Sequence, residues 1–317
     1  MPLLVLAAAA AGWFAFWTGE APSSTPVSVR SEIACAHRGM SATTMFGAVT
    51  ERRQDGSFGA RTSSPLFAAF RVTGPFSAWV EGSGAVVRVR IDGRVATATH
   101  VGGHGCTELR ATLSGTHRVG LELGLGARLS GIRGETSADP MPDSAPRALF
   151  LGDSYTLGVG GAAPPGYAYR AGWAKGWDVR VDAVSGTGFL NRAGHATFAQ
   201  RLPAVLAQDP EVVVVAGGIN DYGNFANAQV AEAARRLFRR LSGSGTQTIV
   251  LSPWMPPRFR VAGYRDLVGR IAAAARAARV RYINTSTWLT SRLMAPDGIH
   301  PNERGYRAIA ARLALRL

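Results

Sequence analysis

The sequence predicts an all-β domain over residues 28–135 followed by an α/β domain over residues 147–317. Two observations predict this division. Short alternating runs interrupted by glycines fill the first half, whereas apolar runs alternate with amphipathic helical patterns in the second half. Three prolines in residues 136–146 separate the two patterns, so we expect a linker there.

The chain begins with an apolar segment, Met1–Trp17, that contains no charged side chain. Its length suits the core of an export signal or a short membrane anchor. We therefore expect residues 1–19 to be a signal peptide or membrane tether, residues 20–27 to be a Pro/Ser linker, and the protein to be secreted or held in the cell envelope. Since no basic residue precedes the segment and no small-x-small cleavage motif follows it, a buried core helix is the alternative.

The only two cysteines, Cys35 and Cys106, both lie in the expected β domain. An oxidising compartment favours a disulfide between them, and two buried free thiols are the alternative. Such a bond closes a long loop of the unfolded chain, which stabilises the fold by roughly 4 kcal/mol in the chain-entropy treatment. Two cysteines are too few for a cysteine-based zinc site or a disulfide-dense scaffold.

The β domain contains several short runs that read as strands. They cover residues 67–72, 76–81, 85–91, 94–99, 108–113 and 117–123. Asp92-Gly93 lies between two of these runs and is a strong hairpin signal. Strands this short and this closely spaced indicate a β-sandwich or jelly roll.

The second half has a different pattern, in which apolar strands alternate with helices. The expected strands cover residues 148–152, 178–184, 211–216, 246–252 and 280–284. Within residues 230–241 the apolar side chains follow helical spacing, and most of the arginines lie away from them. This alternation predicts a parallel sheet with helices on both faces, and ligands of such sheets bind at the carboxyl ends of the strands.

The net charge of +14 is concentrated in the second half of the chain. Residues 1–146 contain 13 Arg against 11 acidic residues, whereas residues 147–317 contain 22 basic against 10 acidic residues. A basic surface attracts anionic polymers, and we expect an anionic cell-envelope polymer as a partner. Because no zinc-finger, basic-zipper or RNA-binding signature accompanies the charge, we expect no nucleic-acid partner.

Polar segments follow four of the apolar strands or open the last helix. They are Leu151–Gly158, Val184–Gly188, Gly217–Asp221 and Asp297–Asn302. In a parallel sheet all four belong at one edge, where they supply a hydroxyl, a glycine amide, a side-chain amide, a carboxylate and an imidazole. This set of groups is what acyl transfer through a serine ester requires.

Each group has an expected role in that chemistry. Ser154 is a weak nucleophile that needs a base, and His300 can be that base. Asp297, three residues earlier, can fix the imidazole tautomer and stabilise the imidazolium. The backbone N–H groups of Ser154 and Gly186 and the side-chain NH₂ of Asn220 can form an oxyanion hole. We expect Asp153 and Asp221, the two carboxylates beside the site, to hold loops by hydrogen bonds rather than to titrate in the reaction.

The sequence lacks the motifs of several other enzyme classes. No G-x-S-x-G elbow surrounds Ser154, and neither a Walker A motif nor a G-x-G-x-x-G after a strand is present. These absences argue against the usual α/β-hydrolases and against nucleotide-cofactor enzymes.

The segments GDSYTLG, SGTG, GGIND and DGIHPN resemble the four sequence blocks of the SGNH (GDSL) hydrolase superfamily over residues 147–317. The resemblance implies a three-layer αβα flavodoxin-like domain and assigns the nucleophile, the acid–base pair and the oxyanion residues as above. It implies no metal or organic cofactor. One departure is Tyr155, where the eponymous motif has Leu. The β-rich first half adds a resemblance in architecture to carbohydrate esterases with an amino-terminal jelly roll.

We therefore expect an exported serine esterase that hydrolyses short acyl esters, above all O-acetyl groups, on a carbohydrate, a cell-envelope polymer or a small ester. An O-acyltransferase with the same triad is the first alternative, followed by a lipase or thioesterase and by a binding module with an inactive site. The segment Pro253–Pro257 is expected to form a rim that shapes a small acyl pocket.

Overall fold

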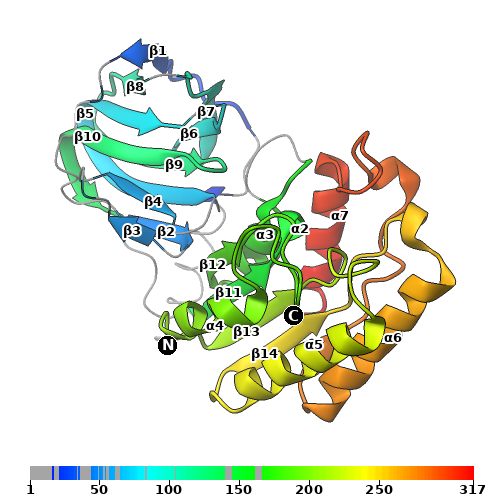
Figure 1. Ribbon diagram of the computed structural model, residues 1–317. Helices are drawn as coiled ribbons and strands as arrows, with labels where there is room; N and C mark the ends of the chain where they lie inside the picture. Colours follow the sequence, from blue (N-terminus) through cyan, green and yellow to red (C-terminus); the bar gives the residue numbers. More distant parts are fainter. Residues whose placement is uncertain are drawn as a thin grey trace. The chain divides into compact units, whose positions relative to one another are not determined.

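The computed structural model describes residues 16–17, 21–33, 35, 44–48, 50–52, 54, 57–60, 65–82, 84–103, 105–139, 145–160 and 166–317. The chain divides into two compact units, Met1–Ala145 and Pro146–Leu317 (Figure 1). The first unit is built of antiparallel strands, and the second is an α/β unit with a parallel sheet. The predicted fold class is therefore confirmed.

The first unit consists of strands joined by turns and loops. Its strands are β1 (Ser28–Ile33), β2 (Thr44–Ala48), β3 (Thr50–Arg52), β4 (Phe58–Ala60), β5 (Leu66–Glu81), β6 (Val86–Ile91), β7 (Arg94–His100), β8 (Cys106–Ala111), β9 (Thr116–Leu123) and β10 (Arg128–Ala138). Every pairing between them is antiparallel. Alternate side chains of β5, β6, β8, β9 and β10 form a buried apolar cluster, in which the rings of Phe70 and Phe76 lie 5.6 Å apart.

Strand β5 corrects one expectation. The runs 67–72 and 76–81 were expected to be separate strands, but they form one continuous strand of 16 residues. The strand changes partners at Gly74-Pro75, pairing with β9 before this point and with β8 after it. The Gly-Pro pair therefore marks a change of neighbouring strand within one continuous strand rather than a chain reversal.

The expected linker also begins too early. Residues 136–138 pair with β5 as the end of β10, so the first three residues of the predicted linker 136–146 are strand. Their side chains have little apolar character, and their strand conformation comes from the ladder to Phe70–Val72. Local composition alone does not report such a pairing.

The predicted export segment lies almost wholly outside the described residues, which include only Phe16 and Trp17 of it. Both side chains are buried in the first unit, where the ring of Trp17 meets that of Phe67 at 5.5 Å. They lie directly on Gly120, whose position leaves no room for a Cβ because it would stand 2.6 Å from both rings. In the part of the chain that the structure describes, we find no helix of the length and apolarity that a membrane crossing needs. The signal peptide or tether stays a prediction.

Cys35 and Cys106 are joined as a disulfide, with their Cα atoms 4.9 Å apart. Cys106 is fully buried at the start of β8. Among the described residues, one cluster has the spacing of metal ligands, and it consists of these two cysteines and Glu81. Since both sulfurs are in the disulfide, this cluster is not a free ligand set.

The second unit carries a five-stranded parallel sheet in the order β12-β11-β13-β14-β15. Its strands are β11 (Arg147–Gly152), β12 (Asp178–Ala183), β13 (Val212–Ala216), β14 (Gln247–Leu251) and β15 (Arg281–Ile283). Its helices are α2 (Ser154–Leu157), α3 (Tyr167–Ala174), α4 (Phe198–Leu206), α5 (Asn227–Ser242), α6 (Ala262–Ala277) and α7 (Glu303–Ala314), with two 3-10 turns, η1 (Pro257–Phe259) and η2 (Ser291–Leu293). This is the expected flavodoxin-like order.

The helices cover both faces of this sheet. Right-handed crossovers place α3 and α7 on one face and α4, α5 and α6 on the other, and α3 packs against α7 as α5 packs against α6 (Figure 1). All five side chains of β13 are buried, as expected for a strand between two helical layers. Helix α5 buries the predicted apolar stripe from Val230 to Leu241 and leaves its arginines on the outer side.

A buried ion pair lies between β6 and β9 of the first unit. The Arg90 guanidinium donates to the Glu122 carboxylate, and neither side chain is exposed. Arg88 donates to the other carboxylate oxygen at 3.2 Å. Removing one member of a buried pair is costly because it leaves the remaining charge without compensation in a medium of low dielectric constant.

We expect Glu122→Gln to lower the free energy of unfolding of the first unit by about 3 kcal/mol, because two arginines lose their buried counter-charge. Urea denaturation followed by circular dichroism measures this change. Glu135→Gln is the matched control, since Glu135 lies exposed on β10 of the same unit. Equal unfolding midpoints for the two variants would contradict the prediction.

Candidate active site

The four predicted motif segments lie at the carboxyl edge of the parallel sheet. Ser154 follows β11 as the first residue of α2, and Gly186 follows β12. Asn220 follows β13, and His300 stands shortly before α7. The strand register brings the first three segments together, because Gly152 of β11 pairs with the last residues of both β12 and β13.

Ser154, His300 and Asp297 form a continuous hydrogen-bonded chain. The Ser154 hydroxyl lies 2.9 Å from His300 Nε2, and His300 Nδ1 lies 2.6 Å from Asp297 Oδ2. Ser154 is 6% exposed, so the residue is almost completely buried. The arrangement leaves Nε2 free to accept the serine proton, since Nδ1–H donates to the carboxylate.

Asp297 is ionised over the working range of pH. Partial burial acts to raise its pKa, but hydrogen bonds from the His300 ring and from the backbone N–H groups of Ile299 and His300 outweigh burial and lower the pKa to about 2. The two backbone bonds measure 2.8 and 2.9 Å and end on Oδ1, so Oδ2 is left for the imidazole. One turn of the chain thus fixes both the carboxylate and the ring that it orients.

The expected oxyanion donors lie on the segments that follow β11, β12 and β13. Among the described residues, the backbone N–H groups of Ser154 and Gly186 have no acceptor. Gly186 has a φ of 75°, and a Cβ there would stand 2.8 Å from the Cβ of Ala193. The Asn220 side-chain NH₂ donates to the Thr187 carbonyl at 2.9 Å and to the Asp153 carboxylate at 3.3 Å, so both of its N–H groups are bonded within the protein.

Asp221 holds the loop that follows Gly186, as expected. Its carboxylate accepts the backbone N–H groups of Phe189, Leu190 and Asn191 at 2.8–2.9 Å. Burial raises the pKa of Asp221, and these three bonds act against that rise. The Asp221 carboxylate is thus bonded to three consecutive backbone N–H groups, and among the described residues it makes no contact with Ser154.

A buried ion pair beneath the site was missed by the sequence analysis. Arg201 of α4 donates to the side chain and backbone carbonyl of Asp182, and also to the Gly152 carbonyl at 2.8 Å and to Thr187 Oγ1 at 3.2 Å. It thereby ties the ends of β11 and β12 to the loop between β12 and α4. The available signal was an acidic residue inside the apolar run of β12, which calls for a buried partner.

The segment Pro253–Pro257 corrects another expectation. Its residues are buried apart from the half-buried Pro257, so it is not an exposed rim. Trp254 is completely buried and stacks on Tyr155 with an interplanar angle of 4°. The Tyr264 hydroxyl donates to the Trp254 carbonyl at 2.6 Å, which fixes the segment from behind. The segment supports the site instead of bordering it.

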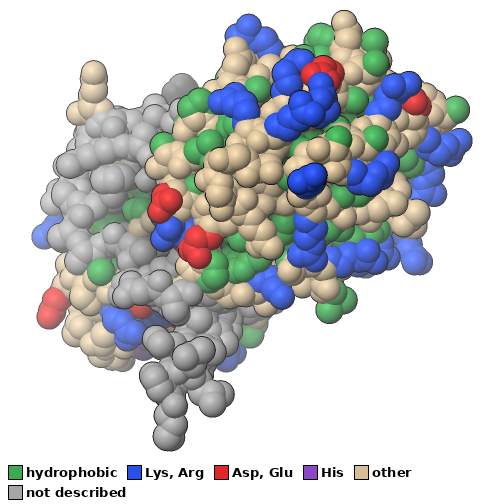
Figure 2. Space-filling model, turned by 90° about the horizontal axis from the view of Figure 1, so that it is seen from below, with side chains coloured by type: hydrophobic (Ala, Val, Ile, Leu, Met, Phe, Trp, Pro, Cys, Tyr) green, Lys and Arg blue, Asp and Glu red, His purple; other side chains and the backbone are tan. Residues whose placement is uncertain are grey.

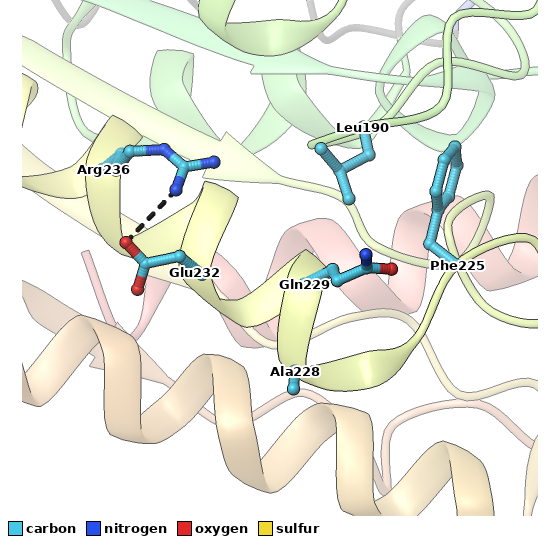
Figure 3. A pocket seen from close by; sticks show the side chains of 6 residues that line it. All are labelled: Leu190, Phe225, Ala228, Gln229, Glu232 and Arg236. Atoms are coloured by element: carbon cyan, nitrogen blue, oxygen red, sulfur yellow. Dashed lines mark hydrogen bonds and ion pairs between the residues drawn. The ribbon is translucent and has the colours of Figure 1, made fainter.

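A hollow of about 550 Å³ borders the two oxyanion loops (Figure 3). Leu190 and Phe225, which follow the Gly186 and Asn220 segments respectively, line one end of it. Gln229 and the Glu232–Arg236 ion pair on α5 line the other end (Figure 3). Its surface is almost wholly apolar, because mainly the carbon atoms of these side chains line it.

Three comparisons agree with this geometry. Residues 150–308, half of the chain, match the model of the GDSL-like Lipase/Acylhydrolase family. The GDSL lipase Rv0518 of Mycobacterium tuberculosis is 31% identical over 185 residues, which are 52% of this chain and 78% of that protein.

Solved structures share the fold of both units at low identity. A family two carbohydrate esterase from Cellvibrio japonicus superposes with a TM-score of 0.69 at 17% identity, covering 92% of this chain and 97% of that one. The salicylyl-acyltransferase SsfX3 from a tetracycline biosynthetic pathway gives a TM-score of 0.66 at 20% identity, covering 86% and 93%. With the family match and the assembled serine, histidine and carboxylate, these likenesses identify the chain as a member of the GDSL (SGNH) lipase/acylhydrolase family and as a serine ester hydrolase.

Proposed function

We propose that Ser154, His300 and Asp297 act as a catalytic triad that hydrolyses short acyl esters, above all O-acetyl esters, on a carbohydrate or cell-envelope polymer outside the cytoplasm. The observation that carries the proposal is the hydrogen-bonded chain from the Ser154 hydroxyl through the imidazole to a carboxylate with a pKa of about 2. A nucleophile, its base and the group that orients the base are thus already in place.

The reaction follows from these positions in two balanced steps. The Ser154 oxygen attacks the ester carbonyl while His300 Nε2 takes the hydroxyl proton, and the imidazolium then gives that proton to the departing alcohol. A water molecule next attacks the acyl-serine, loses its proton to His300, and releases the acid while Ser154 regains its proton. Ser154 N–H and Gly186 N–H, which have no acceptor among the described residues, stabilise the oxyanion in both steps, and the Asn220 amide joins them by giving up its 3.3 Å bond to Asp153.

Three features support a carbohydrate substrate. The structural relative from Cellvibrio japonicus is a carbohydrate esterase with the same two-unit architecture. The apolar segment Met1–Trp17 favours export to where acylated polymers lie. Figure 2 shows Lys and Arg side chains spread over one face of the molecule with few acidic ones, and exposed arginines line the outer sides of α5 and α6. Such a surface attracts acidic glycans.

An O-acyltransferase is the second candidate function, and the likeness to a salicylyl-acyltransferase favours it. The first step of the mechanism is identical for both activities. They differ in whether water or a sugar hydroxyl attacks the acyl-serine. Release of alcohol with and without a sugar acceptor, combined with analysis for an acylated sugar, separates them.

Asp153 lies behind the oxyanion side chain and is completely buried. Its carboxylate is 3.3 Å from the Asn220 amide nitrogen and accepts the backbone N–H of Tyr155 at 3.0 Å. Burial raises the pKa of Asp153 to about 7, with a smaller contribution from the Asp221 carboxylate, while the Tyr155 N–H and Arg201 act in the opposite direction. The folded protein therefore binds a proton here that the unfolded chain releases at a lower pH.

We expect Ser154→Ala and His300→Ala each to lower kcat on p-nitrophenyl acetate by about 10⁴-fold or more, and Asp297→Asn to lower it by a smaller factor. The loss follows from removing the nucleophile or its base. Ser244→Ala, at an exposed position two residues beyond the end of α5, is the control and should retain full activity. Full turnover by folded Ser154→Ala protein would end the proposed mechanism.

The raised pKa of Asp153 makes a prediction about stability. The folded state keeps the Asp153 proton up to about pH 7, whereas the unfolded chain releases it near pH 4. The contribution of this residue to the free energy of unfolding is therefore lost as the pH rises from about 4 to 7. Asp153→Asn has no proton to lose. The difference between its free energy of unfolding and that of the wild type should therefore shift in favour of the variant by on the order of 3 kcal/mol between pH 4.5 and pH 8. Urea titrations at several pH values test this, and parallel curves for the two proteins would refute it.

The substrate preference is tested with p-nitrophenyl esters of increasing acyl length, alongside release of acetate from acetylated polysaccharides. We expect kcat/KM to be highest for acetate and to fall with chain length, and we expect acetate release from at least one acidic polysaccharide. Preference for acyl chains of eight or more carbons, with no acetate released from any polymer, would replace this proposal with a lipase.

A further inference from the structure

Tyr155 directly follows the nucleophile, at the position where the eponymous motif has Leu. Its side chain is completely buried in α2. A leucine fills such a place with apolar contacts alone, whereas a tyrosine brings a hydroxyl that needs a hydrogen-bond partner inside the protein. The identity of that partner decides whether the replacement of leucine by tyrosine at this position affects the reaction.

The Tyr155 hydroxyl donates to the backbone carbonyl of Ile299, the residue before His300. The Tyr155 ring also lies against the imidazole itself, with ring centres 5.8 Å apart. A single side chain therefore joins the segment that carries the nucleophile to the segment that carries its base, although the two are far apart in the sequence.

The ring of Tyr155 is held in place on its other side. It stacks on Trp254 at 5.6 Å, and Trp254 is itself fixed by the Tyr264 hydroxyl on its carbonyl and by an edge contact with Tyr167 at 5.3 Å. Burial raises the pKa of Tyr155 well above its ordinary value, so the hydroxyl remains a donor at every working pH. The bond to Ile299 is thus made from a fixed ring by a group that does not lose its proton.

We propose that Tyr155 is a positioning residue for the base of the reaction. By holding the Ile299 peptide it keeps His300 Nε2 within hydrogen-bond reach of the Ser154 hydroxyl, where the distance is 2.9 Å. This inference rests on the proposed function, since it assigns His300 as the base. Small displacements of a catalytic group lower the rate strongly, whereas they leave the binding of the substrate unchanged.

The first test is Tyr155→Phe, which keeps the ring and removes the hydroxyl. We expect kcat on p-nitrophenyl acetate to fall about tenfold, the effect of one lost internal hydrogen bond, with KM changed less than twofold. Tyr167→Phe is the matched control, because it removes a buried hydroxyl that bonds Thr156 at 2.9 Å and does not touch the His300 segment. Its kcat should stay within twofold of the wild type. Equal kcat values for the two variants would overturn the proposal.

The second test separates positioning from general packing. In a His300→Ala background there is no base to position, so adding Tyr155→Phe should not lower the residual rate further. If Tyr155→Phe lowers that residual rate by the same factor as in the wild type, its role is structural and the proposal is wrong. Tyr155→Leu restores the residue of the eponymous motif but not the hydroxyl, so it should lose at least as much kcat as Tyr155→Phe. Wild-type kcat in Tyr155→Leu would overturn the proposal.

The failure of this proposal differs from the failure of the triad. If His300→Ala keeps full activity, the proposed function itself is wrong. If His300→Ala is inactive while Tyr155→Phe is fully active, the triad stands and only the positioning role is refuted. Circular dichroism and thermal unfolding of each variant establish that the compared proteins are folded.

Discussion

The parallel pairing of β11 with β12 on one side and with β13 on the other is the constraint on which the active site depends. Gly152 at the end of β11 pairs with Ala183 and with Ala216, so the chain leaves all three strands at the same level. Three loops that are distant in the sequence therefore emerge side by side. A shift of one residue in either ladder would move an oxyanion donor by about 3.3 Å, beyond hydrogen-bond reach of the reacting carbonyl oxygen.

The loops are then fixed mostly by backbone bonds to two carboxylates, of which that of Asp221 is buried and that of Asp297 is exposed. Asp221 accepts three N–H groups of the loop after Gly186, and Asp297 accepts two N–H groups of the turn that contains His300. Neither arrangement needs regular secondary structure. Loops held by a carboxylate suit a site whose N–H groups must remain available to a substrate. The Asp221 carboxylate accepts the N–H groups that follow in the loop and leaves the Gly186 N–H unused.

Much of this arrangement could be predicted from the sequence, because both the strand pattern and the motif residues are local signals. The order of the sheet and the grouping of the four motif segments follow from strand–helix alternation and from the rule on strand ends. Features that depend on distant partners could not be predicted. The role of Arg201 requires knowing that α4 lies beneath β11 and β12, and the burial of Trp254 requires knowing that Tyr155 and Tyr264 enclose it. The unbroken β5 was missed because Gly74-Pro75 has the composition of a turn, while the ladders on either side of it decide the conformation.

The position of His300 and Asp297 along the chain has a consequence for biosynthesis. Ser154, Gly186 and Asn220 lie within residues 154–220, whereas Asp297 and His300 stand on a turn just before α7, which packs on α3. A nascent chain that has folded its first four parallel strands therefore holds a serine without a base. The hydrogen-bonded chain from Ser154 through His300 to Asp297 can therefore form only once residue 300 has been synthesised and lies against Ser154.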